Sequence, residues 1–99
     1  MSDGFGFAAP PFKPEEALAR LRRDLRELGL SEREGVFERR GLAMARVRVD
    51  GAQLAAARVE RPSRTGPRWL ARTLDSSAAV RDFSAELKKV LQQWGDRDD

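Results

Sequence analysis

The chain has 99 residues and a mass of 11.1 kDa, which is enough for one small domain. Hydrophobic residues make up 40% of it, but 14 of them are Ala, so the large apolar side chains support one modest core. Charged residues make up 35%, with 16 Arg against 3 Lys, while Cys and His are absent. Those two absences exclude disulfides, thiol nucleophiles, imidazole acid–base chemistry and Cys/His zinc sites from this chain.

Residues 1–13 show neither a helical nor a strand period, and their Gly and Pro residues keep the backbone irregular. We therefore expect a flexible Phe/Pro-rich tail; the alternative is that its three Phe residues pack on the domain or on a partner. The start of the chain lacks the charged and apolar regions of a secretory signal, and no stretch is suited to span a bilayer. These features predict a cytoplasmic protein without a membrane partner.

A first helix is predicted from Pro14, which suits the first helical position and is followed by two Glu residues. Four leucines then recur at spacings of three and four and form one apolar stripe: Leu18, Leu21, Leu25 and Leu28. Gly29 is a typical helix terminator, and Leu30 is placed to close the cap against the last turn.

From residue 42 the apolar period changes to two, which predicts strands. Asp50-Gly51 between alternating runs favours a two-residue hairpin turn that pairs Val49 with Ala52. A competing interpretation makes 52–61 a helix, because the segment is rich in Ala. The hairpin assigns one set of side chains to the core, namely Ala43, Ala45, Val47, Val49, Ala52, Leu54 and Ala56. It turns the other set outward, namely Leu42, Met44, Arg46, Arg48, Ala55, Ala57 and Val59.

The remaining elements follow from turn residues and a second stripe. Residues 36–39 are a further strand or the bulged start of the next one, residues 62–67 are a loop, and residues 69–74 are the last strand. Asp75, Ser76 and Ser77 offer N-caps to a final helix that Gly95 ends. Its stripe comprises Val80, Phe83, Leu87, Val90, Leu91 and Trp94. Residues 14–94 thus form one domain, and residues 95–99 are a frayed acidic tail.

The predicted fold class is α+β in the order α-β-β-β(-β)-α. It combines an antiparallel sheet of three or four strands with two helices packed on one of its faces. A helix, three strands and a helix, over residues 14–94, is similar to the double-stranded-RNA-binding domain. That family carries a Lys-rich cluster at the start of its second helix, where this chain has Ser76 to Val80 followed by Arg81 and Asp82. The resemblance is therefore confined to the order of the elements.

Positive charge is concentrated in the middle of the chain. Residues 36–72 contain nine Arg and three acidic residues, a net charge of +6, whereas the flanking segments are acidic. Arg46 and Arg48 project from the face opposite the core, and three further arginines surround the loop beside Trp69. The candidate contact surface is Arg46, Arg48, Arg61, Arg64, Arg68 and Trp69. The preference for Arg over Lys is also typical of coding in a G+C-rich, bacterial-like genome.

Two functional hypotheses follow, both non-catalytic. The first is a protein-interaction module, self-association included, because the outward set mixes apolar side chains with arginines and the sheet has free edges. The second is binding of nucleic acid or another polyanion through the arginines and Trp69. An enzyme is not expected, since no residue pattern indicates a catalytic, cofactor-binding or metal site.

Overall fold

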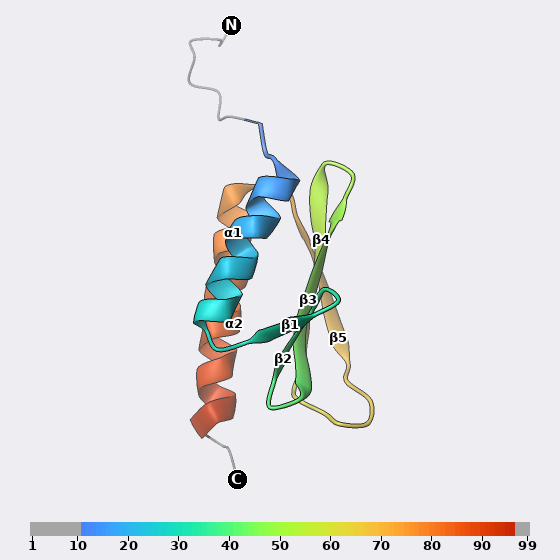
Figure 1. Ribbon diagram of the computed structural model, residues 1–99, viewed down its shortest axis with the longest axis vertical. Coiled ribbons are helices and arrows are strands. Elements are labelled where there is room, and N and C mark those ends of the chain that lie inside the picture. The colour runs from blue at the N-terminus through green and yellow to red at the C-terminus, as the bar shows by residue number, and fades with distance from the viewer. Residues whose placement is uncertain (1–10, 97–99) are drawn as a thin grey trace, which may run out of the picture.

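A computed structural model describes residues 11–96. The elements are α1 (Pro14–Glu27), β1 (Ser31–Arg33), β2 (Val36–Arg39), β3 (Leu42–Asp50), β4 (Gln53–Val59), β5 (Trp69–Leu74) and α2 (Ser77–Asp96). The strands form one antiparallel sheet in sequential order, β1 to β5. Figure 1 shows both helices on the same side of the strands and running in the same direction. The predicted α+β class is confirmed, whereas the sheet has five strands and not three or four.

Helix α1 ends as its sequence predicts. Gly29 has a φ of 94°, and its N–H donates to the carbonyl oxygen of Arg26 at 2.9 Å. The N–H of Leu30 donates to the carbonyl oxygen of Leu25 at 3.2 Å, which completes a Schellman motif. Leu30 is itself buried beside Leu21 and Leu25, so the cap also fixes the direction in which the chain enters the sheet.

Strand β1 is the element that sequence patterning missed. Its three residues are all polar and carry no apolar alternation. The strand is held by the hairpin to β2, whose two turn residues, Glu34 and Gly35, have φ values of 53° and 82°. Two successive positive φ values define a type I′ turn, and its twist matches that of paired strands. Local turn geometry therefore adds a strand, and the chain departs from the helix, three-strand, helix order of the double-stranded-RNA-binding domain.

The β3–β4 hairpin forms, but its turn lies one residue later than predicted. Asp50 pairs with Gln53 and Val49 with Leu54, so Gly51 and Ala52 are the central residues. Gly51 has a φ of 65°, whereas Ala52 has a negative φ, as a type II′ turn with Gly at its first central position requires. Each β3 residue therefore pairs with a β4 residue two positions later than predicted. Because side chains alternate with a period of two, this shift leaves each paired side chain on its predicted face of the sheet. The alternative helix over 52–61 is wrong, because 53–59 is β4.

Replacing Gly51 with Ala tests this turn. The added Cβ meets no atom within 4 Å, so the cost arises from the positive φ and is expected to be about 1–2 kcal/mol of unfolding free energy. Gly66→Ala is the matched control, because that site is equally open and has no positive φ. Urea denaturation followed by circular dichroism measures both variants. Equal losses in the two variants would contradict the assigned turn.

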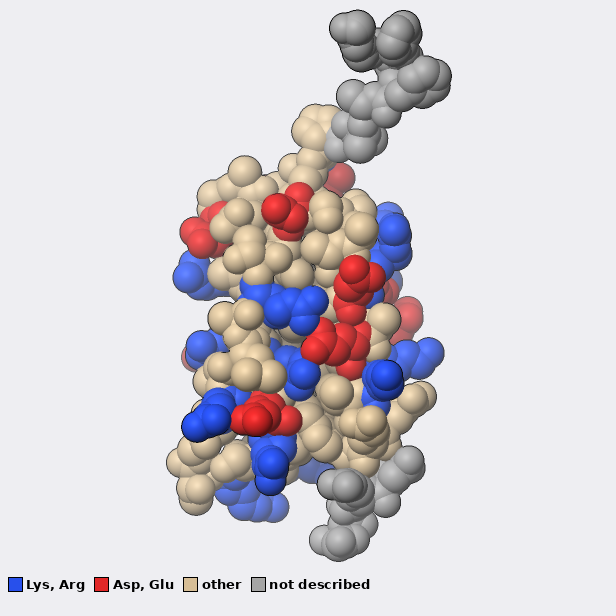
Figure 2. All heavy atoms as spheres, turned by 180° about the vertical axis from the view of Figure 1, so that it is seen from behind, with Lys and Arg blue, Asp and Glu red and all other residues tan. Residues whose placement is uncertain are grey.

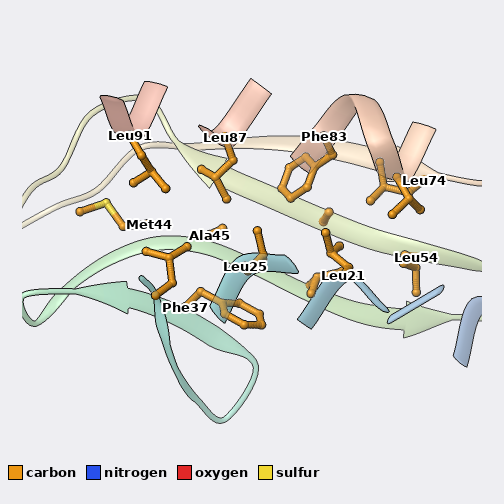
Figure 3. Close-up of a cluster of buried hydrophobic side chains, with 14 of the residues drawn as sticks. Leu21, Leu25, Phe37, Met44, Ala45, Leu54, Leu74, Phe83, Leu87 and Leu91 are labelled. Atoms are coloured by element: carbon orange, nitrogen blue, oxygen red, sulfur yellow. The ribbon is translucent and has the colours of Figure 1, made fainter. Parts of the chain in front are cut away.

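A bulge in β3 changes one predicted orientation. Phe37 pairs with Ala45 and Glu38 with Ala43, which leaves Met44 as an extra residue on β3. Met44 and Ala45 are consequently both buried instead of alternating between the two faces. Met44 was expected on the outward side, but it joins the core near Leu91 of α2 (Figure 3).

Helix α2 completes the core. The Ser76 hydroxyl oxygen accepts the N–H of Ala79 at 3.1 Å, which confirms Ser76 as an N-cap. Phe83, Leu87 and Leu91 are buried and point toward the side chains of α1 and the sheet (Figure 3). The helix continues through Gly95, where the sequence predicted its end. Of the tails predicted at 1–13 and 95–99, residues 1–10 and 97–99 lie outside the described residues. Phe12, within the predicted N-terminal tail, is partly buried and packs against the core.

Candidate contact surface

The sheet face away from the helices, called the outer face below, follows from the alternation of the strands. Leu54, Ala56 and Leu74 belong to the core, so their neighbours along β4 and β5 point to the other side. Across β3 the same side carries Arg46, which pairs with Ala57. The outer face comprises Val36, Arg46, Arg48, Ala55, Ala57, Val59, Trp69, Ala71 and Thr73.

Arg46 and Trp69 are in contact on this face. The Arg46 guanidinium carbon lies 4.4 Å from the centre of the Trp69 ring, a cation–π arrangement between β3 and β5. Trp69 pairs with Val59 on the intervening strand, and Arg46 pairs with Ala57. Val59 is fully buried and Ala57 is 3% exposed. The sequence predicted that the side chains of Ala57 and Val59 would be exposed, but both are buried, and Val59 belongs to the core cluster against which Trp69 packs.

On the helix side, other arginines have internal partners. Arg58 donates through Nε to a carboxylate oxygen of Glu86 at 2.9 Å, and Arg72 also pairs with Glu86. Arg39 donates to the main-chain oxygen of Leu91 at 3.2 Å. These side chains join β2, β4 and β5 to α2, so part of the Arg-rich block stabilises the fold itself.

The Glu86 carboxylate has a pKa that its surroundings displace. Partial burial, the largest single influence, raises its pKa, but the hydrogen bonds from Arg72 and Arg58 and the charges of both arginines together lower it by more. The pKa therefore lies below the ordinary value of 4.5. The carboxylate stays ionised across the neutral range and holds two guanidinium groups against α2.

A different set of arginines has no such partners. Arg48, Arg61 and Arg64 are exposed and form no ion pair or hydrogen bond within residues 11–96. Arg68 lies 3.7 Å from Glu60, but its side chain is 78% exposed, so this pair contributes little. Figure 2 shows basic and acidic groups interspersed over one side of the molecule, with basic groups predominating toward its lower end.

The structure thus places the six candidate residues in two neighbouring segments. Arg46, Arg48 and Trp69 lie on the outer face, while Arg61, Arg64 and Arg68 lie in the loop between β4 and β5. The contact of Arg46 with Trp69, the first residue after that loop, connects the two. Sequence reasoning missed Arg33, which pairs in the β1–β2 register with Val36 of the outer face; its side chain is 77% exposed and lies 4.0 Å from the Glu38 carboxylate. No signal could reveal it without β1.

A groove of about 770 Å³ also lies between the starts of α1 and α2. Its charged lining residues are balanced in sign and comprise Lys13, Arg20, Arg81, Glu16, Asp24 and Asp75. Within residues 11–96 no cluster of three or more acidic side chains is placed to hold a metal ion. No helix in that part of the chain is long and apolar enough to cross a membrane.

No family model, curated protein or solved structure matches this chain.

Proposed function

We propose that this protein is a non-catalytic nucleic-acid-binding module that contacts phosphates through its outer face and the β4–β5 loop. The observation that carries the proposal is a division among its arginines. Arg39, Arg58 and Arg72 are engaged with α2, whereas Arg48, Arg61 and Arg64 are exposed and have no partner among residues 11–96. Exposed guanidinium groups bind phosphate oxygens in two-point geometry, which suits a polyanion better than a neutral surface.

Arg46 and Trp69 add a second element to the proposed site. The stacked pair holds one guanidinium in place, so less side-chain entropy is lost when it binds a ligand. Aromatic rings and guanidinium planes both stack on unpaired bases, and such contacts tolerate any sequence. These properties favour a single strand over a duplex as the ligand.

A protein partner on the outer face is the weaker of the two original hypotheses. It depended on exposed apolar side chains, but Met44, Ala57 and Val59 are buried. What the face offers instead is Arg46 and Arg48 among small side chains, a surface with less apolar area to bury. Protein contact is better supported at the edge of the sheet formed by β5.

Removing Arg46 and Arg48 together tests the proposal. The probe is a labelled single strand of about 20 nucleotides, longer than the sites of most such modules. Fluorescence anisotropy between about 50 and 200 mM salt gives the affinity and its salt slope. With both arginines replaced by Ala, we expect weaker binding and a slope smaller by about 1.4, because two phosphate contacts are lost.

Arg20→Ala/Arg23→Ala is the matched control, since it removes the same charge from exposed positions on α1. We expect it to change affinity and slope much less. Absence of any binding by the unaltered protein at low salt would overturn the proposed function. Equal losses in the two double variants would show an effect of net charge and contradict the assigned surface.

A further inference from the structure

The two edges of the sheet differ in how they are protected. β1 has only three residues, and two of them are charged. β5 has six residues with no Pro or Lys, and its Arg72 is paired with Glu86. Short strands and edge charges prevent strands of other molecules from pairing, and β5 has neither device.

The β5 edge is uncovered within residues 11–96. β5 pairs with β4 on one side only, so alternate N–H and C=O groups along it face away from the sheet. Residues 70–73 are all exposed, in place of the alternation that a covered strand shows. Leu70, at 37%, is the exposed large hydrophobic residue of the described chain. In Figure 1, β5 forms the border of the sheet farthest from β1.

We propose that β5 pairs with β5 of a second copy of this chain, in antiparallel orientation about a two-fold axis. Residues directly opposite each other in such a pair point to the same face of the sheet, whereas consecutive residues of one strand point to opposite faces. The two-fold axis therefore passes between two copies of the same residue and not between consecutive residues. The register with Ala71 opposite Ala71 of the second copy avoids placing Arg72 opposite another arginine, whereas a shift to Leu70 opposite Leu70 would place it opposite Arg68. Leu70 then lies opposite the aliphatic stem of Arg72, and Trp69 lies opposite Thr73.

Charge at the two ends of β5 argues for a second copy as the occupant. Arg68 precedes the strand with a side chain that is 78% exposed, and Asp75, also exposed, follows it. Antiparallel pairing brings the start of each strand beside the end of the other, so Arg68 approaches Asp75 of the second copy twice in the dimer. A parallel pairing would instead bring like charges together.

The dimer has one continuous sheet of ten strands with both outer faces on the same side. This arrangement shares Arg68 and Trp69 with the proposed nucleic-acid surface, but it depends on the β5 edge and not on Arg46 or Arg48. If both proposals hold, the two basic faces lie on one surface, and avidity increases the affinity for a long strand.

Ala71→Glu tests the interface by placing two carboxylates opposite each other at the axis. Light scattering coupled to size-exclusion chromatography and sedimentation equilibrium give the mass against the monomer value of 11.1 kDa. We expect the unaltered protein to dimerise, and Ala71→Glu to weaken the dimer by about tenfold or more. Ala19→Glu, at an exposed site on α1, is the control and retains the dimer.

A charge exchange keeps the test decisive if Ala71→Glu fails to fold, which circular dichroism detects. Arg68→Asp is expected to weaken the dimer, and Arg68→Asp combined with Asp75→Arg is expected to restore it. A monomer at all concentrations overturns the proposal. So does a dimer that survives both a folded Ala71→Glu and the single Arg68→Asp. Failure here leaves strand binding by Arg46 and Arg48 unaffected, so the two proposals fail separately.

Discussion

Replacing Phe83 with Ala is expected to lower the free energy of unfolding by about 3–5 kcal/mol, the largest effect of any single change considered. Phe83 is fully buried and lies where α2 faces α1 and the sheet (Figure 3). Truncation removes the ring from the core and leaves a cavity that the rigid strands fill only in part. A domain of this size has about 5–15 kcal/mol of stability in total, so the variant loses a large part of it.

Urea denaturation at one fixed protein concentration measures the effect. Phe83→Leu is the matched variant, because it retains most of the volume, and its expected loss is well below that of Ala. Gln92→Ala, at an exposed position of the same helix, is expected to change stability by no more than about 0.5 kcal/mol. A loss in Phe83→Ala no larger than in Gln92→Ala would contradict the packing of α2 on the sheet.

Replacing Glu86 with Gln is expected to cost about 1–3 kcal/mol at neutral pH. The carboxylate accepts from Arg58 and Arg72, and the Arg58 side chain is only 16% exposed. Without the charge, a poorly hydrated guanidinium loses its ionic partner, which is costlier than the loss of a surface pair. Glu60→Gln is the matched control, since its pair with Arg68 is exposed and its expected effect is about 0–1 kcal/mol.

The difference in stability between the unaltered protein and Glu86→Gln is expected to depend on pH. Because Arg72 and Arg58 outweigh the effect of burial, the pKa of Glu86 in the folded protein is below its ordinary value of 4.5. A lowered pKa contributes stability that is complete above the unfolded value and is lost as the pH falls through the folded value. The difference between the unaltered protein and Glu86→Gln should therefore be constant from pH 7 to about 5 and shrink below about 4. A difference that grows on acidification would contradict the assigned ion pairs.

Helices and the middle strands were predictable because their apolar period is long enough to be unambiguous. The leucines of α1 and the stripe of α2 through Phe83 and Leu91 fix both helices and their buried sides. Strand β5 has the predicted bounds, Trp69–Leu74, although the sequence did not determine its register with β4. Gly29 gave the end of α1 for a purely local reason, since its left-handed conformation closes the Schellman motif.

Features that depend on one residue of register were not predictable. β1 has no apolar side chain, so only its turn and its pairing with β2 make it a strand. Met44 lies in the core because β3 has a bulge there. The alternating sequence of β3 carries no signal that one residue will be left without a partner on β2. The Asp50-Gly51 signal was correct for a hairpin but placed Gly51 second in the turn, where the chain uses it first.

The sequence predicted that the candidate surface is rich in arginine, but not which of its arginines form ion pairs within the fold. Nine arginines between residues 36 and 72 mark a basic segment. Only the fold separates Arg58 and Arg72, which pair with Glu86, from Arg48, which has no partner in the described part of the chain. Alternate residues along a strand point to opposite faces of the sheet, so an arginine reaches Glu86 only if it points to the face that α2 covers. The sequence does not show which face that is.

The sequential strand order has a kinetic consequence. Each of the first three strand pairings closes a turn of two residues, so the sheet from β1 to β4 assembles from neighbours at small entropic cost. Within the sheet only β5 must close a longer connection, over residues 60–68, whereas the contacts of α1 with α2, β3 and β4 join distant parts of the chain. The fold therefore has mostly local contacts for a five-stranded protein, a topology associated with rapid formation.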